Sequence, residues 1–320
     1  MNLEAVPMKE SEIFKDFQNH DRNAYPQPVV RVTGGMGGEA LLIMGPEKTA
    51  LYDAGMACFS DRLLVNLKKA LAGRNLDYIV LSHTHYDHIG GLPYVLDQWP
   101  DALVCASEKA ARVFRSEGAR KTILDLGINA AANYGIDHIN IMVNPLRVDR
   151  ILKDGDLICL GGNAWLKALE TKGHTDCAMT FLLEPEGILF TCESTGVLVS
   201  PEHNDISALK DFEETIRVAG RLKALDFQWL ISPHYGVVPQ WFNGRYFDLY
   251  IEMAERERDF IEGLIRQGKD FEEIMEAHKA VYWLHGRSDA QPFAAYRLNT
   301  ESEVKQLIYK ISQEENKNDL

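Results

Sequence analysis

The stretch SHTHYDHIGG, residues 82–91, decides how the rest of the chain is interpreted. It arranges His83, His85, Asp87 and His88 as H-x-H-x-D-H, after a short apolar run and before two glycines and a helical pattern. A loop that leaves a strand can bring several imidazoles and a carboxylate around a cation, and these ligands suit Zn²⁺, Fe²⁺ or Mn²⁺. Chance produces such a pattern in roughly one chain in a thousand. The stretch therefore predicts a metal site.

The flanking sequence alternates between strand and helix patterns. Residues 60–72 and 205–223 predict helices, whereas residues 117–145 predict a loop or short helices. Turn residues at 34–38, 154–156 and 184–187 predict hairpins. Short apolar runs bounded by turn residues predict strands, and these runs cover residues 29–33, 40–44, 49–52, 78–81, 103–106, 165–170, 179–183, 188–191 and 227–231.

The pattern changes near residue 247. Three helical patterns then follow without strands between them, at 247–267, 271–284 and 300–311. We therefore predict a sandwich domain over residues 1–246 and a helical cap over residues 247–320. The polar end, residues 313–320, is expected to fray.

Composition narrows the class of protein. The 320 residues carry 34 Lys and Arg against 47 Asp and Glu, a net charge of −13, which weighs against nucleic-acid binding. No apolar run approaches the roughly 18–20 residues of a membrane span, and residues 1–17 lack the apolar core of a signal peptide. The five cysteines show no C-x-x-C spacing, so structural disulfides are not expected. We expect a cytoplasmic protein.

Later motifs complete a resemblance to the metallo-β-lactamase-fold hydrolase superfamily. The motif DAG at 53–55 resembles the family's D-x-G, and GHT at 173–175 resembles its G-H-[ST]. FTCE at 190–193 and SPHYG at 232–236 resemble its F-[ST]-G-D and P-G-H-G elements. The resemblance covers roughly residues 28–245. It implies an α/β (α+β) fold, a four-layer αββα sandwich of two mixed sheets with metals at one sheet edge.

The resemblance also implies roles for individual residues. His83, His85 and His174 would hold one metal. Asp87, His88 and His234 would hold a second, with Glu193 and a hydroxide bridging the two. Asp53 would support the ligands from behind them, and Asp87 would also orient the nucleophile. The implied cofactors are two divalent ions, zinc first, with iron or manganese as alternatives.

The chain departs from the family pattern at the bridging carboxylate. Glu193 stands where Asp is usual, so it either bridges, binds one metal only, or leaves the second site weak. On this basis Glu193→Asp is expected to preserve or raise metal occupancy. Cys192, in place of the usual Gly, is a weaker candidate ligand because a neighbouring strand residue faces the other way. Tyr235 and His203 are candidate substrate-pocket residues.

The function implied is hydrolysis of a small-molecule ester, thioester, lactone or phosphoester. The alternatives are a metal-bound sensor with little turnover and a mononuclear iron dioxygenase. Flavin-dependent diiron members of the superfamily carry Glu where this chain has His85, and no flavodoxin-like pattern follows. The expected partner is a small-molecule substrate, with no nucleic acid and no membrane, while homo-oligomer formation stays open.

Overall fold

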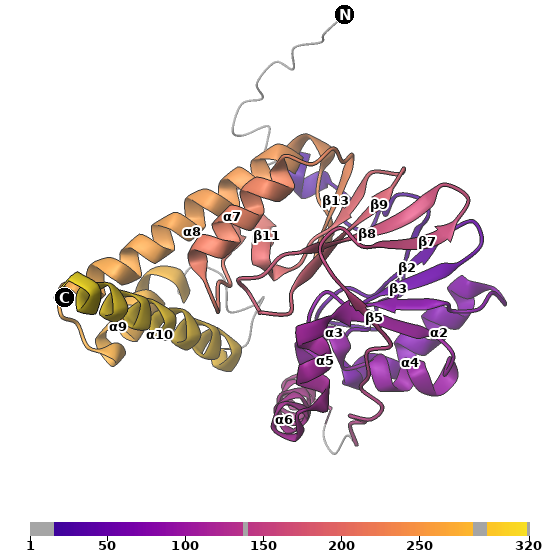
Figure 1. The fold of residues 1–320 in the computed structure, drawn as a ribbon, viewed down its shortest axis with the longest axis horizontal. Coiled ribbons are helices and arrows are strands. Elements are labelled where there is room, and N and C mark those ends of the chain that lie inside the picture. The colour runs from indigo at the N-terminus through magenta and orange to yellow at the C-terminus, as the bar shows by residue number, and fades with distance from the viewer. Residues whose placement is uncertain (1–15, 137–139, 284–292, 319–320) are drawn as a thin grey trace, which may run out of the picture.

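The computed structural model describes residues 16–136, 140–283 and 293–318, and in these ranges two six-stranded sheets pack face to face (Figure 1). The first sheet has the order β1-β2-β3-β4-β5-β6, antiparallel from β1 to β3 and parallel from β3 to β6. Its strands are β1 (Val29–Arg31), β2 (Leu41–Met44), β3 (Thr49–Tyr52), β4 (Tyr78–Val80), β5 (Leu103–Ser107) and β6 (Arg150–Leu152).

The second sheet has the order β14-β13-β10-β9-β8-β7. Only its β10–β13 pair is parallel. The carboxyl ends of parallel strands meet at one edge of a sheet, so β10 and β13 deliver the residues that follow them to the same place. The strands are β7 (Leu157–Gly161), β8 (Ala164–Glu170), β9 (Met179–Glu184), β10 (Ile188–Phe190), β13 (Trp229–Ser232) and β14 (Gly236–Val237).

Helices cover both outer faces, which confirms the four-layer αββα sandwich (Figure 1). The first sheet is covered by α2 (Ser60–Leu71), α3 (Tyr86–Ile89), α4 (Leu92–Gln98), α5 (Glu108–Arg115) and α6 (Glu117–Asn133). The second sheet is covered by α7 (Phe212–Lys223) and α8 (Asn243–Arg266). Beyond them lie α9 (Phe271–His278) and α10 (Phe293–Asn318), and a small sheet pairs β11 (Val197–Ser200) with β12 (His203–Asp205).

Apolar burial explains why these layers hold together. Tyr52 and Phe190 lie between the sheets with ring centroids 5.4 Å apart. Leu41, Leu42 and Ile43 of β2 are all fully buried, since this strand is covered on both faces and needs no polar alternation. A further apolar cluster joins α7, α8, α9 and α10 to the outer face of the second sheet.

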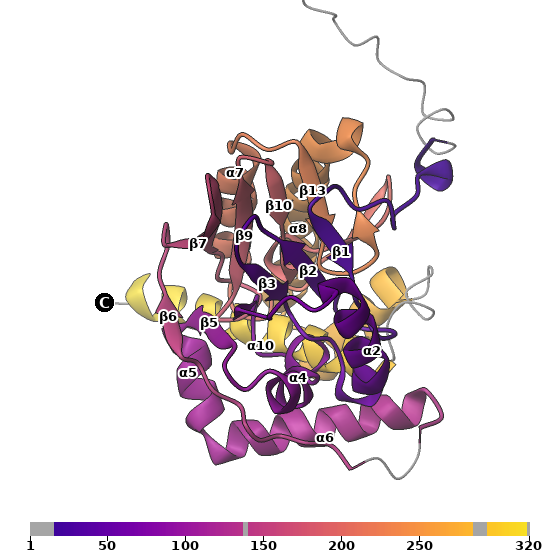
Figure 2. The ribbon, with the colours of Figure 1, turned by 90° about the vertical axis from the view of Figure 1, so that its right-hand side faces the viewer.

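Three local predictions need correction. Residues 154–156 do not close a hairpin, because β6 pairs with β5 in the first sheet while β7 pairs with β8 in the second. A turn that crosses between sheets has the same local sequence pattern as a hairpin. Residues 117–133 form the long helix α6, seen at the bottom of Figure 2, in place of a loop or short helices. Helix α7 begins only at Phe212, with the Asp211 side chain capping it.

The C-terminal helices also differ in detail from the prediction. Helix α8 begins at Asn243, so the predicted boundary at 246/247 falls inside it. Helix α10 continues to Asn318, into the range 313–320 that was expected to fray, and a short π-helical segment, Lys279–Trp283, follows α9. Residues 1–15, which make up most of the segment expected to lack a signal peptide, lie outside the described residues. Leu284 of the predicted 271–284 helix lies outside them too.

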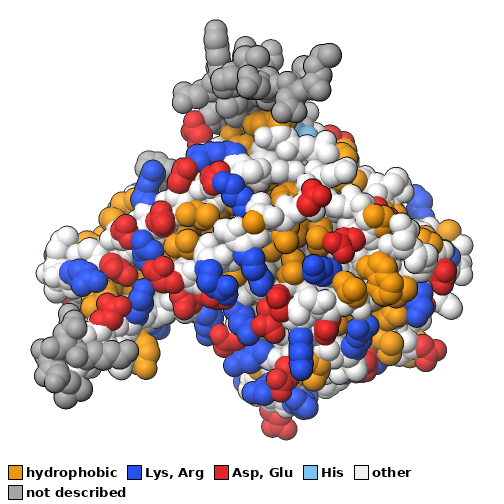
Figure 3. All heavy atoms as spheres, turned by 45° about the horizontal axis from the view of Figure 1, so that its top comes forward, with side chains coloured by type: hydrophobic (Ala, Val, Ile, Leu, Met, Phe, Trp, Pro, Cys, Tyr) orange, Lys and Arg blue, Asp and Glu red, His pale blue; other side chains and the backbone are white. Residues whose placement is uncertain are grey.

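The surface lacks both a membrane-spanning helix, among the described residues, and a single acidic patch on the face drawn in Figure 3. In the described part of the chain, every helix is too short or too polar to cross a lipid bilayer. On the face shown in Figure 3, Lys and Arg side chains are interspersed with Asp and Glu. The net charge of −13 is therefore not gathered into one acidic patch on that face.

Candidate metal centre

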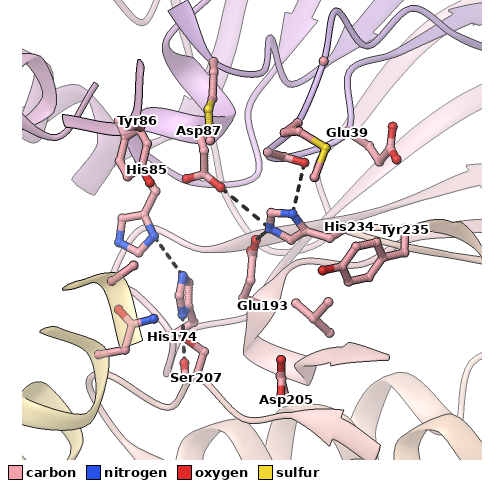
Figure 4. Close-up of a pocket in the computed structure, with 18 of the residues that line it drawn as sticks. Glu39, His85, Tyr86, Asp87, His174, Glu193, Asp205, Ser207, His234 and Tyr235 are labelled. Atoms are coloured by element: carbon pink, nitrogen blue, oxygen red, sulfur yellow. Dashed lines mark hydrogen bonds and ion pairs between the residues drawn. The ribbon is translucent and has the colours of Figure 1, made fainter. Parts of the chain in front are cut away.

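The predicted ligands converge at one edge of the sandwich (Figure 4). His83 and His85 lie in the loop after β4, and Asp87 and His88 lie in the one-turn helix α3. The backbone N–H of His88 donates to the carbonyl of His85 at 3.0 Å, which turns the chain so that these side chains face one another. The second sheet supplies the rest: His174 follows β8, Glu193 follows β10 and His234 follows β13.

His83, His85 and His174 form the first group, with one nitrogen from each ring within 4.8 Å of the others. The Nδ1–H of His174 donates to the Ser207 carbonyl at 2.8 Å, so Nε2 carries the lone pair and lies 3.0 Å from His85 Nδ1. The buried Nε2 of His83 has no hydrogen-bond partner. Burial lowers the pKa of all three, that of His85 to about 3, which keeps them in the neutral form that metals bind.

Asp87, His88 and His234 form the second group. The Nε2 atoms of His88 and His234 lie 3.5 and 3.7 Å from Asp87 Oδ2. His234 Nδ1–H donates to the Gly37 carbonyl at 3.1 Å, which points Nε2 into the group. Burial opposes charge on both imidazoles, but the Glu193 and Asp87 carboxylates outweigh it and raise the pKa of His234 and, further, that of His88.

Glu193 lies between the two groups. Its Oε1 is 2.7 Å from His88 Nε2 and 2.8 Å from His234 Nε2, whereas Oε2 is 3.6 Å from Nδ1 of His83 in the first group. Oε2 is buried without a hydrogen-bond partner. Burial raises the pKa of Glu193, but His88 and His83 outweigh this and hold it well below its usual range. Buried nitrogen and oxygen atoms without hydrogen-bond partners are suitable ligand atoms for divalent ions such as Zn²⁺, Fe²⁺ or Mn²⁺.

Asp53 supports this arrangement from behind. It is fully buried, has a left-handed backbone with φ of 51°, and accepts hydrogen bonds from the Ser82 N–H and hydroxyl at 2.8 and 2.6 Å. It also accepts from His88 Nδ1–H at 2.9 Å, which directs His88 Nε2 toward Glu193. The Ser82 hydroxyl, 2.9 Å from His83 Nδ1, links the same carboxylate to the first group.

The glycine-rich turn at 34–38 has a role that the sequence did not indicate. It connects β1 to β2 as predicted. In addition, a Cβ at Gly38 would lie 2.5 Å from the His88 ring, so only glycine allows this approach. Together with the Gly37 carbonyl on His234, the turn shapes the second metal-ligand group.

A cavity of about 470 Å³ opens onto these ligands. Tyr235, whose φ of 64° is unusual for a residue with a side chain, lines it and turns its hydroxyl toward Glu193 and His234 (Figure 4). His203 is not among the residues that line the cavity. It pairs at 2.7 Å with Asp205, and Asp205 does line the cavity. Cys192 Sγ contacts Thr171 Oγ1 at 3.3 Å and belongs to none of the ligand groups found in the described residues.

Helix α10 contributes to the centre in a way that no motif predicted. Ala295 and Asn299 line the cavity. Glu303 accepts a hydrogen bond from the Ala208 N–H at 2.9 Å, and Gln306 donates to the Ala208 carbonyl. The preceding residue, Ser207, is the one whose carbonyl orients His174. Helix α10 therefore holds the loop whose Ser207 carbonyl orients His174, a predicted metal ligand.

Comparison with protein families and curated proteins identifies proteins that are similar in sequence. The model of the metallo-beta-lactamase superfamily matches residues 33–226, more than half of the chain. The chain is 25% identical over 169 residues to a flavo-diiron protein of Clostridium acetobutylicum, covering 52% of this chain and 36% of that protein. It is 24% identical over 192 residues to an anaerobic nitric oxide reductase flavorubredoxin homolog of Escherichia coli O157:H7, covering 58% and 40%. The chain thus spans less than half the length of these relatives.

Solved structures show the same fold. A metallo-beta-lactamase family protein from Thermus thermophilus aligns with a TM-score of 0.54 and 20% identity, covering 74% of this chain and 82% of that one. An archaeal superfamily protein from Sulfolobus tokodaii aligns with a TM-score of 0.52 and 21% identity, covering 73% and 87%. At this identity the likeness concerns the fold alone.

Proposed function

Because the chain belongs to the metallo-β-lactamase superfamily, we propose that it is a metal-dependent hydrolase of a small-molecule ester, thioester, lactone or phosphoester. The observation that carries the proposal is Glu193, one carboxylate in contact range of both ligand groups. Two ions held by these ligand groups and Glu193 would lower the pKa of water toward neutrality and polarise the oxygen of the group under attack. Water adds to the carbonyl carbon or phosphorus, the ester or thioester bond breaks, and an acid and an alcohol or thiol are released.

The chain's own residues divide the remaining work. Asp87 lines the cavity beside His88 and His234, where its free carboxylate oxygen can accept a proton from the attacking water. The Tyr235 hydroxyl faces the same place and can donate a hydrogen bond to the developing oxyanion. Ala130 of α6 and Ala295 and Asn299 of α10 also line the cavity, where they limit access of bulk water.

We propose two divalent ions as cofactors, zinc first, with iron or manganese as alternatives, and a small molecule as the partner. All five cysteines are free thiols, and this supports a cytoplasmic location. Neither nucleic acid nor membrane is part of the proposed function.

The test is turnover of a substrate panel by protein loaded separately with zinc, manganese or iron. The panel contains aryl esters, thioesters, lactones and phosphodiesters, and Asp87→Asn is the matched catalytic variant. We expect at least one substrate class to be hydrolysed, with the rate removed by a chelator, restored by metal and reduced by roughly 10²–10⁴-fold in Asp87→Asn. Turnover that survives metal removal, or no turnover with any metal, contradicts the proposal.

A diiron redox centre is a second candidate, because the curated relatives named above are a flavo-diiron protein and a nitric oxide reductase flavorubredoxin homolog. Iron content after aerobic and anaerobic purification distinguishes the two. Near-stoichiometric iron at both sites, together with consumption of O₂ or nitric oxide by the chemically reduced protein, would favour the redox function. One iron per chain would favour the mononuclear dioxygenase, and tight metabolite binding without turnover would favour the sensor.

A further inference from the structure

The cavity wall includes a segment that precedes the first strand. The carbonyl of Arg22 accepts a hydrogen bond from the Val237 N–H at 2.9 Å, and His20 Nε2 lies 3.1 Å from the Val237 carbonyl. A Cβ at Gly236 would lie 2.3 Å from the Arg22 carbonyl oxygen, so glycine permits this approach. Strand β14 begins two residues after the ligand His234, and the segment is therefore held beside the metal centre.

The side chain of Arg22 is fixed in place on this wall. Its two terminal nitrogens donate to the carbonyls of Leu198 and Val199 at 3.2 and 3.3 Å. Its Cζ lies 4.7 Å from the Phe17 ring centroid and 5.8 Å from that of Tyr235. A guanidinium restrained in this way loses little conformational freedom when it binds a ligand. Arg22 and Tyr235 both line the cavity.

The charge of Arg22 has no counter-ion among the described residues, where its side-chain contacts are two carbonyls and two rings. The other cavity arginine, Arg31, pairs with Glu39 at 2.8 Å, and Asp205 pairs with His203. Burial lowers the pKa of Arg22, as expected for a cation partly removed from water. Two of the five guanidinium N–H groups are engaged by carbonyls, which leaves three for a ligand.

The opposite side of the cavity is different in character. Figure 4 shows Tyr86 and Tyr235 on opposite sides of the metal-ligand groups. Tyr86 offers mainly the apolar surface of its ring to the cavity, whose lining also includes the largely apolar side chains of Tyr134 and Met56. A molecule that spans the cavity from Tyr86 to Arg22 would contact an aromatic ring at one end and a cation at the other, with its middle at the metal-ligand groups.

We propose that Arg22 is a subsite for an anionic oxygen group of the substrate, a carboxylate or a phosphate, and that the natural substrate is a small amphipathic anion hydrolysed at a bond between its apolar and anionic ends. This inference rests on the proposed hydrolase function, and it specifies the class of substrate. Arg22 acts as a specificity-determining residue that makes no contact with the reacting bond.

The first test compares aryl esters matched in size, a glutarate monoester with a free carboxylate and its neutral methyl ester, at 0.3 M salt, where long-range charge effects are screened. We expect wild type to favour the anionic ester in kcat/KM by about 10–100-fold, the range of a charged hydrogen-bonded contact. Arg22→Gln should bring this ratio near one, and Arg22→Lys should restore part of it. The double variant Arg31→Gln with Glu39→Gln, which removes an internally neutral pair from the same cavity, should keep the ratio.

The second test measures binding without turnover. Glutarate, phenyl phosphate and the neutral glutaramide are titrated calorimetrically into metal-loaded wild type and Arg22→Gln. We expect Arg22→Gln to lower the affinity for one or both anions about tenfold or more and to leave the affinity for glutaramide unchanged. The anion whose affinity falls more identifies the group that Arg22 binds. Absence of hydrolysis with this binding pattern would reject the hydrolase and keep the subsite.

Three results would overturn the subsite. One is a wild-type ratio of anionic to neutral ester near one, which needs no variant to fold. Another is hydrolysis of both esters with a ratio that Arg22→Gln does not change. The third is anion affinity that Arg22→Gln leaves intact while its melting temperature falls, which would make Arg22 only a clamp for the N-terminal segment.

Discussion

The length of the Glu193 side chain matters for the predicted metal centre. Its Oε1 lies within 2.8 Å of both His88 Nε2 and His234 Nε2, and the backbone at this position begins a tight 3₁₀ turn, Glu193–Thr195. The ligand groups are thus spaced for the longer side chain. The sequence alone predicts that Glu193→Asp preserves or raises metal occupancy, whereas this geometry leads us to predict the opposite.

We predict that Glu193→Asp lowers metal occupancy of the second group by roughly 10-fold or more, because the carboxylate retreats by about 1 Å while metal bond lengths tolerate only about 0.2 Å. Elemental analysis after dialysis against a weak chelator measures this. Glu193→Gln, which keeps the length and removes the charge, is the matched control and should also lose metal. Equal occupancy in Glu193→Asp and wild type would show that the backbone follows the shorter side chain.

The imidazoles of the second group predict a pH effect on metal uptake. In the metal-free protein the pKa values of His88 and His234 are raised, so these rings hold protons that a metal must displace, whereas His83, His85 and His174 are already neutral. Uptake should therefore release protons, and affinity should fall as the pH is lowered. Calorimetry of zinc binding in buffers of different ionisation enthalpy counts the protons. No net release at pH 7 would contradict this account.

At the residue scale, most of the candidate metal ligands could be predicted from the sequence. The six His and Asp ligands could be predicted because each lies in a short motif at a strand end. Arg22 and Ser207 could not, because Ser207 acts through its carbonyl and Arg22 reaches the cavity from a segment with no motif. His203 was predicted for the pocket from a loop position, but the structure pairs it with Asp205.

At the scale of elements, α10 links the C-terminal helices to the metal centre. Glu303 and Gln306 bind the two backbone groups of Ala208, next to the Ser207 carbonyl that orients His174. Outer contacts of this kind typically change metal affinity by roughly 10–100-fold when they are removed. Helix α10 thus acts on the first group without supplying a ligand.

We predict that Glu303→Gln combined with Gln306→Ala weakens zinc binding at the first group about tenfold. Competition with a chromophoric chelator measures the affinity, and the visible spectrum of the cobalt-substituted protein reports the ligand geometry, which a purely structural defect would not change. Glu301→Gln, on the exposed face of the same helix, is the control. Identical cobalt spectra and affinities in all three proteins would show that α10 does not position His174.

Elements could be predicted less completely than ligands. The strands that flank the motifs can be predicted from the sequence because apolar runs bounded by turn residues mark them. The crossing from β6 to β7 was missed, since pairing between distant strands decides whether a turn closes a hairpin. Helix α6 was missed because its buried positions include Gly127, Ala130 and Ala131, which give little amphipathic contrast.

At the scale of the whole molecule, the C-terminal helices share a core with the sandwich. Phe247, Tyr250 and Ile261 of α8 and Leu307 of α10 belong to the same buried cluster as Phe212 of α7 and residues of the second sheet. The division at residue 246 predicted from sequence marks a change of pattern, and this shared cluster crosses it.

A chain ending at residue 246 should therefore fail to fold cooperatively. Loss of a buried large side chain costs roughly 3–5 kcal/mol, and the loss of several exceeds the 5–15 kcal/mol by which domains are stable. Thermal unfolding followed by circular dichroism tests this against the full chain. A cooperative transition in the shortened protein, with zinc affinity intact, would show that residues 1–246 form an independent domain.

The central claim is that the two ligand groups and Glu193 hold two metal ions. It is tested most directly by elemental analysis of protein purified with zinc, iron and manganese supplied, for wild type and His85→Ala. We predict about two metal ions per chain in wild type, and loss of most of the bound metal in His85→Ala. Wild-type protein that retains no metal under these conditions would contradict the account.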